Sequence, residues 1–167
     1  MKNIYRLAAM AAALFALTAC GGVHNTVITE PSNGFIIEQT TLLPVSVKSR
    51  ETNKDAQALN AKWKSMAESQ LRTLLNNENI KIVKDSTTTV NCTIDVTYGN
   101  QALRYFVGFG AGSGHINVTI EMRDANGEVL YATKSEADLA VGFFGGNMSS
   151  VANKTIESAV QEFGSKL

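Results

Sequence analysis

The spacing of hydrophobic residues predicts two long helices. Between residues 53 and 75, apolar side chains recur at steps of three and four, and Lys, Glu and Gln occupy the remaining positions, which is the period of an amphipathic helix. Residues 148–163 repeat this pattern, with Asn147 or Ser149 in the N-cap position and Gly164 at the end. Trp63 lies in the first apolar stripe, so we expect it to anchor the core.

Elsewhere apolar and polar residues alternate, which predicts strands near residues 41–48, 80–84, 90–96, 115–122 and 129–133. Pro44 suits a sheet edge or a strand start. The turn signal at residues 124–127 predicts that the last two strands form an antiparallel hairpin, and the strand-helix-strand order favours a right-handed parallel crossover. The predicted fold is α+β, in the order β-α-β-β-β-β-α, with a mixed sheet and two helices packed on one face.

The first nineteen residues have the features of an export signal. Lys2 and Arg6 precede an apolar run over residues 7–16, and about ten residues are too few to span a bilayer, which needs roughly twenty. The run ends in Leu17-Thr18-Ala19-Cys20, which resembles the lipobox of bacterial lipoproteins. This resemblance implies that residues 1–19 are a signal peptide that is removed and that Cys20 becomes a lipidated N-terminus. A simple secretory signal is the alternative.

The same resemblance implies how the protein is held. It implies that the Cys20 thiol receives a diacylglyceryl group and that the new N-terminus receives an amide-linked acyl chain such as palmitate. Two or three acyl chains suffice for stable anchoring. Gly21 stands where an Asp would resemble an inner-membrane retention signal, which favours the outer membrane, facing the periplasm. Residues 20–37, rich in Gly, Asn and Thr, are expected to form the lipidated N-terminus and a flexible tether, although Val27 and Ile28 are candidates to join the sheet. Residues 38–167 then form a single globular domain.

Charge and cysteine content exclude several classes of protein. Fifteen basic residues balance fifteen acidic ones without a Lys or Arg cluster, so a nucleic-acid partner is not expected. Losing Lys2 and Arg6 with the signal leaves a slightly acidic chain. The two cysteines are too few for a disulfide scaffold. Cys92 lies at an apolar position of an alternating strand, and we expect a buried thiol there, with a reactive thiol as the alternative.

Seven of the thirteen glycines fall in two aromatic-rich segments, residues 103–114 and 141–146. A glycine spacing of two does not match a Walker loop or a dinucleotide fingerprint, but it leaves one side of an extended strand bare. In an antiparallel meander the two segments would lie at the same end of the sheet. Either Phe143 or Phe144 covers the bare side within the core, or exposed rings form a docking patch for a protein or a bilayer. The candidate patch consists of Arg104, Tyr105, Phe106, Phe109, Phe143 and Phe144; Arg104 has a second interpretation, an ion pair with Asp95.

Residues 103–114, the turn at 124–127 and residues 142–146 together resemble a family of small bacterial lipoproteins, domain of unknown function 4410. The resemblance covers about residues 38–165, and its most specific part is the Arg-aromatic-x-Val-Gly-Phe-Gly-Ala-Gly stretch that begins at Arg104. The family implies an envelope lipoprotein and supplies neither a reaction nor catalytic residues.

No pattern in the sequence indicates catalysis. His24 and His115 have no ligating residues at metal-site spacing, no Gly-x-Ser-x-Gly elbow occurs, and the acids are scattered singly. We therefore expect no enzyme, metal or cofactor. The leading hypothesis is a lipid-anchored, non-enzymatic interaction module of the cell envelope, with the membrane and an envelope protein as partners. The alternatives are a lipoprotein that binds a small ligand or peptidoglycan, and a hydrolase whose site cannot be recognised in the sequence.

Overall fold

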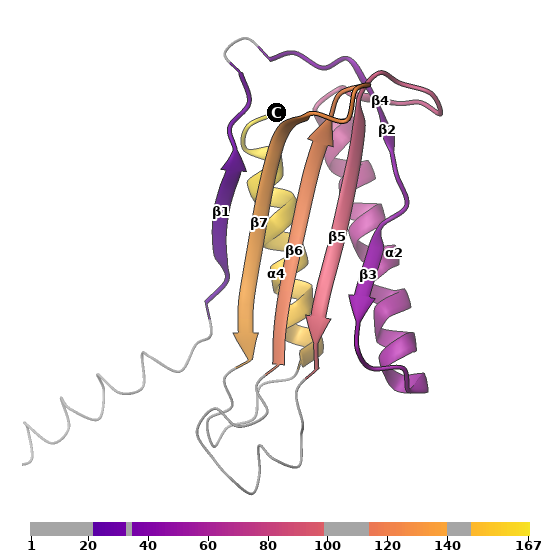
Figure 1. The fold of residues 1–167 in the computed structure, drawn as a ribbon, viewed down its shortest axis with the longest axis vertical. Helices are drawn as coiled ribbons and strands as arrows, with labels where there is room; N and C mark the ends of the chain where they lie inside the picture. The colour runs from indigo at the N-terminus through magenta and orange to yellow at the C-terminus, as the bar shows by residue number, and fades with distance from the viewer. Residues whose placement is uncertain (1–21, 33–34, 99–113, 140–147) are drawn as a thin grey trace, which may run out of the picture.

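The computed structural model describes residues 22–32, 35–98, 114–139 and 148–167, which form a seven-stranded sheet and two helices (Figure 1). The elements are β1 (His24–Thr29), β2 (Gln39–Leu42), β3 (Ser46–Ser49), α2 (Lys54–Asn77), β4 (Lys81–Ile82), β5 (Thr89–Thr97), β6 (Gly114–Arg123), β7 (Val129–Leu139) and α4 (Met148–Gly164).

The sheet is mixed, and both helices lie on the same face of it (Figure 1). Its strand order is β1-β7-β6-β5-β2-β4, and β3 pairs with β5 beyond the end of β2. The β5-β6-β7 meander and β1 are antiparallel, whereas β2, β3, β4 and β5 pair in parallel. The predicted α+β class, the order of helices and strands, and the hairpin at residues 124–127 are confirmed. Gly127 has a φ of +84°, which is why this turn needs a glycine.

The strand predicted over residues 41–48 is divided into two strands at Pro44. Leu42 pairs with Val90 and Ser46 with Thr93, so four steps along one strand span three along β5. Pro44 has no N–H to donate to the sheet. Because the segment from Leu42 to Ser46 contains one residue more than the facing part of β5, the backbone N–H of Val45 also points away from β5. That N–H, on Val45, donates to the Glu68 carboxylate at 3.0 Å.

Strand β1 confirms the alternative that Val27 and Ile28 join the sheet, so residues 24–29 of the predicted tether are not a free linker. Residues 24–29 pair with β7, from His24 opposite Glu136 to Thr29 opposite Ala132, with an irregularity between Val27 and Thr29. Val27 packs against the core, so the segment gains buried apolar contact in addition to its pairing with β7. The ordered domain therefore begins well before residue 38.

The core lies between the helices and the face of the sheet that they cover. Trp63 is 0% exposed, and its ring stacks on Tyr98 at a centroid distance of 5.7 Å; Tyr131 stacks on Phe163 at 5.0 Å. The expected burial of Cys92 is confirmed. Burial, and to a lesser extent the nearby Glu68 carboxylate, raise the pKa of the Cys92 thiol to about 12, so the thiol stays protonated and unreactive near neutral pH.

Candidate functional site

The residues predicted to act directly lie outside the described part of the chain. This holds for the lipidation site Cys20, for Asn147 as a helix cap, and for the whole candidate patch of Arg104, Tyr105, Phe106, Phe109, Phe143 and Phe144. The structure does describe the residues that flank them, and these fix where each segment leaves the domain.

Both glycine-aromatic segments leave from one end of the sheet, which we call the loop end and define by Tyr98, Gly114, Leu139 and Met148. Thr97 pairs with His115, and Gly114 pairs with Leu139, so the strand ends that flank the two segments are neighbours, as the meander predicted. The start of β1 lies at this end as well, because His24 pairs with Glu136 (Figure 1). The loop end thus gathers the N-terminal connection and the flanks of both segments.

Gly114 shows that the bare side of the glycine run is covered where the run enters β6. A Cβ atom built there would lie 3.1 Å from the Met148 sulfur, 3.2 Å from the Tyr98 carbonyl oxygen and 3.3 Å from the Thr97 carbonyl oxygen. Tyr98 is itself held, since its hydroxyl donates to Asn60 Oδ1 at 2.6 Å. The loop end is therefore closely packed and joined to the first turns of α2.

Replacing Gly114 with Val should lower the free energy of unfolding by about 1–3 kcal/mol, because two backbone oxygens cannot move aside for the branched side chain. Gly114→Ala should cost less, since the flexible Met148 side chain can shift. Urea unfolding measures both. Gly22→Val is the matched control, because nothing lies within 4 Å of a Cβ at Gly22; equal stability of the Gly114 and Gly22 variants would contradict this packing.

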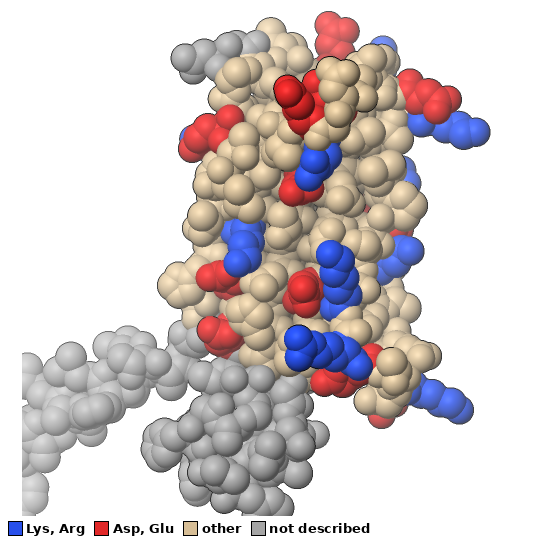
Figure 2. Space-filling view, in the orientation of Figure 1, with Lys and Arg blue, Asp and Glu red and all other residues tan. Residues whose placement is uncertain are grey.

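The face of the sheet that the helices leave open carries charges of both signs (Figure 2). Near the loop end, His115 Nδ1 lies 2.5 Å from Asp138 Oδ1, and Lys134 pairs with Glu136 at 2.5 Å. The hydrogen bond from Lys134 and its charge hold the pKa of Glu136 below its usual value. The described residues contain no group of three or more His, Cys, Asp or Glu side chains placed to hold a metal ion.

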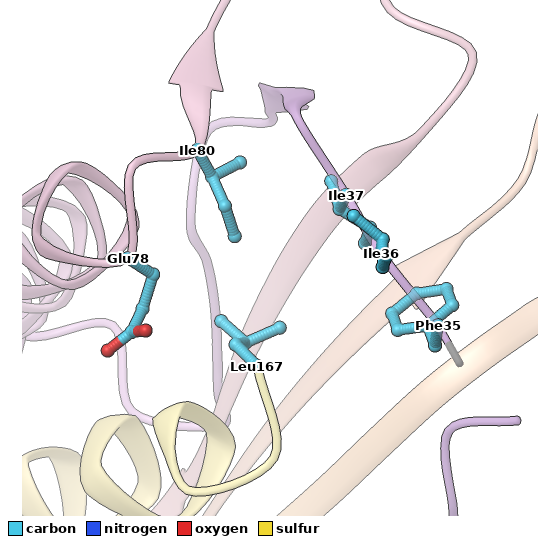
Figure 3. Close-up of a pocket in the computed structure, with 6 residues that line it drawn as sticks. All are labelled: Phe35, Ile36, Ile37, Glu78, Ile80 and Leu167. Carbon is cyan, nitrogen blue, oxygen red and sulfur yellow. The ribbon is translucent and has the colours of Figure 1, made fainter. Parts of the chain in front are cut away.

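A small pocket lies at the opposite end of the domain (Figure 3). Its volume is about 170 Å³. One side is the chain segment that precedes β2, and the other side is the end of α2 together with the last residue of the chain. We call it the distal pocket, and it is lined by Phe35, Ile36, Ile37, Glu78, Ile80 and Leu167.

The end of α2 shapes one wall of this pocket. Asn79 adopts a left-handed conformation with a φ of 59°, its N–H donates to the Asn76 carbonyl, and the Ile80 N–H donates to the Leu75 carbonyl at 2.8 Å. This pair of bonds is a Schellman motif, which stops a helix and reverses the chain. The reversal leaves Glu78 at the rim while Ile80, 4% exposed, points inward (Figure 3).

The rim of the distal pocket exposes one large apolar side chain, that of Ile36, and one acidic side chain, that of Glu78. Ile36 is 84% exposed, which is unusual for a side chain that gains so much from burial. Glu78 is exposed as well, and among the described residues no cation forms an ion pair with its carboxylate. Sequence reasoning missed this pocket. The signal was the apolar run at residues 35–37 inside a segment interpreted as a tether.

Comparison with solved structures gives several matches. The PelC dodecamer from Paraburkholderia phytofirmans is 18% identical, with a TM-score of 0.50 over 86% of this chain and 97% of that one. A homologue of a neuraminyllactose-binding hemagglutinin from Helicobacter pylori is 6% identical, with a TM-score of 0.48 over 83% and 88%. A minor lipoprotein from Acinetobacter baumannii is 12% identical, with a TM-score of 0.39 over 78% and 92%. Among curated proteins no sequence matches this chain.

No helix in the described ranges is both long and apolar enough to cross a membrane. The likeness to solved structures establishes the fold alone, whereas the comparison with family models assigns the sequence itself. The model of a domain of unknown function, DUF4410, matches residues 31–143, which is more than half of the chain, and the protein therefore belongs to the DUF4410 family.

Proposed function

We propose that this protein is a lipid-anchored lipoprotein of the bacterial outer membrane, facing the periplasm, that acts as a non-enzymatic interaction module through its loop end. One observation carries the proposal: strand β1 begins at His24, only four residues after the predicted lipidation site Cys20. The described residues that flank the predicted anchor and both glycine-aromatic segments therefore lie at one end of the domain.

The short connection sets how far this end can stand from the membrane. Four residue steps reach at most about 14 Å when fully extended, whereas the tether predicted from sequence would have allowed several times that distance. If acyl chains on Cys20 hold the chain in the bilayer, the loop end stays close to the lipid headgroups. The contact that the segments make is then with the bilayer surface or with a protein at that surface.

The proposal predicts that Phe109→Asp and Phe144→Asp abolish the contact while the domain melts at its normal temperature, because a carboxylate removes the apolar gain of an exposed ring. Site-specific crosslinking from the loop end in intact cells measures the contact, and circular dichroism measures melting. Leu43→Asp, at a partly exposed residue beside Val90 and away from the loop end, is the matched control for an added charge.

Two outcomes would oppose this proposal. If both Phe variants fail to fold, the rings belong to the core and form no patch. If the wild-type protein instead sediments with purified cell-wall material and both Phe variants still do so, a peptidoglycan-binding lipoprotein becomes the better interpretation.

A further inference from the structure

We propose that strand β1 is a releasable strap, which leaves the edge of the sheet while the rest of the domain stays folded and so lengthens the connection to the bilayer. The strap comprises residues 23–30, and in the described part of the chain it pairs with β7 alone. The lengthening rests on the proposed anchoring at Cys20, whereas the release follows from the way in which β1 is held.

Strand β1 is held by little apolar burial and by one surface ion pair. Every residue of the strand is exposed or half-buried, and Val23 and Val27 pack against the core while only partly buried. The ion pair joins Glu30 to Lys166 at 3.6 Å, between two exposed side chains, so it contributes little. Strand β6, by contrast, has four apolar side chains that are 0% exposed: Ile116, Val118, Ile120 and Met122. Because buried apolar surface is the main source of packing stability, β1 is held less firmly than β6.

The hydrogen bonds of one side chain, that of Asn25, join β1 to β7 and α4. Its Oδ1 atom accepts hydrogen bonds from the hydroxyls of Ser135, at 2.6 Å, and Ser158, at 3.1 Å. Its Nδ2 atom donates to the Glu162 carboxylate at 3.4 Å. Asn25 is exposed, so water can replace these partners when β1 leaves, and the net gain from each bond is small.

A buried hydroxyl beside β1 weakens the docked state directly. Thr133 pairs with Val27 of β1 on one side and with Ile120 of β6 on the other. It is 1% exposed, and its Oγ1 atom has no hydrogen-bond partner within the described residues, which costs free energy. Release of β1 opens the Val27 side of Thr133 to water, which can then bond to the hydroxyl. The docked form thus carries a cost that the released form does not.

Release changes both the length and the place of the connection between Cys20 and the domain. With the strap docked, β1 begins at His24, four residue steps from Cys20. Once residues 23–30 are free, the next residue paired in the sheet is Gln39, and the steps from 20 to 39 reach at most about 65 Å. Gln39 lies near the start of β5, because Thr41 pairs with Thr89, and not at the loop end. The loop end can then turn away from the headgroups and meet a partner tens of ångströms from the bilayer.

Amide hydrogen exchange, followed by NMR on the full lipidated chain in lipid nanodiscs, tests the release. The protected amides of β1 should exchange about 100-fold faster than those of β6, because local opening needs less free energy than global unfolding. Thr133→Val should slow exchange in β1 about ten-fold by removing the unpaired hydroxyl, and Asn25→Ala should accelerate it about ten-fold. Asn91→Ala is the matched control, the same change at a half-buried residue of β5, and should leave exchange in β1 unchanged.

A matched pair of variants tests the lengthening. Val27→Asp places a carboxylate against the core and should release β1, whereas Ile28→Asp adds the same charge at a neighbour that is 55% exposed and should leave it docked. Nitroxide groups on the lipid headgroups broaden the amide signals of residues close to the bilayer. Broadening at Gly114 and His115, at the loop end, should fall on the order of ten-fold in Val27→Asp, because it decreases steeply with distance, and should persist in Ile28→Asp.

Three results would overturn the proposal. Equal exchange rates in β1 and β6 would mean that β1 leaves only when the whole domain unfolds. Loss of the β6 signals in Val27→Asp would mean that the domain cannot stand without β1. Unchanged broadening in a folded Val27→Asp chain would mean that release does not free the loop end. Failure of the anchoring is recognised separately, because the wild-type chain would then not elute with the nanodiscs, while the exchange rates would still report whether β1 opens.

Discussion

Trp63→Ala should lower the free energy of unfolding by about 3–5 kcal/mol, the range expected when a large aromatic side chain is removed from a closed core. Trp63 is completely buried in the middle of α2, and its ring stacks on Tyr98. Tyr98 in turn hydrogen-bonds to Asn60 and Ala56. The cavity left by Ala would therefore loosen both the core and the support of the loop end. Urea unfolding followed by circular dichroism measures the change.

Trp63→Phe separates the packing of the ring from the polar atom that it carries. Within the described residues the indole Nε1 of Trp63 is buried and has no hydrogen-bond partner, and a buried, unpaired donor costs free energy. Phe keeps most of the aromatic volume and removes that donor, so we expect a loss of less than about 2 kcal/mol. Lys64→Ala, on the exposed side of the same helix, should change stability by no more than about 0.5 kcal/mol. A Trp63→Ala midpoint equal to that of Lys64→Ala would contradict the packing.

The elements that were predictable from the sequence are those whose pattern is long and local. Helix α2 spans 24 residues and α4 spans 17, and each repeats its apolar stripe over several turns. Strands β5 and β6 alternate buried and partly exposed residues along most of their lengths. The hairpin between β6 and β7 follows from a turn whose residues are adjacent in the chain.

Strand β1 could be suspected but not assigned, because its partner is distant. Asn25 pairs with Ser135, 110 positions further along the chain, and the irregularity after Val27 interrupts the alternation that would mark a strand. The distal pocket is hidden for the same reason: Ile36, Ile80 and Leu167 come from three separate regions that meet only in the folded domain. Local pattern shows which residues are apolar, but it does not show which apolar residues come together.

Cys20→Ser should move the protein from the membrane fraction to the soluble periplasmic fraction and leave its melting temperature unchanged. A serine hydroxyl cannot form the thioether that carries the diacylglyceryl group, and each buried methylene contributes about 0.8 kcal/mol to membrane binding. Losing two or three chains therefore removes practically all anchoring. Cell fractionation followed by immunoblotting measures the change, and Gly21→Asp is the matched control. That variant should remain membrane-bound and shift toward the inner membrane on a density gradient.

If the Cys20→Ser protein stayed in the membrane fraction, anchoring would have to come from another part of the chain. The short connection from Cys20 to β1 would then no longer limit the distance between the loop end and the bilayer. If it becomes soluble, the length of that connection can be tested directly. Inserting about ten Gly and Ser residues between Gly22 and Val23 allows the loop end to move away from the bilayer without altering β1, which begins at His24. A contact between the glycine-aromatic segments and the bilayer surface would then weaken, whereas a contact with a soluble periplasmic protein would persist. The spacer thus distinguishes the two partners that the loop end can serve.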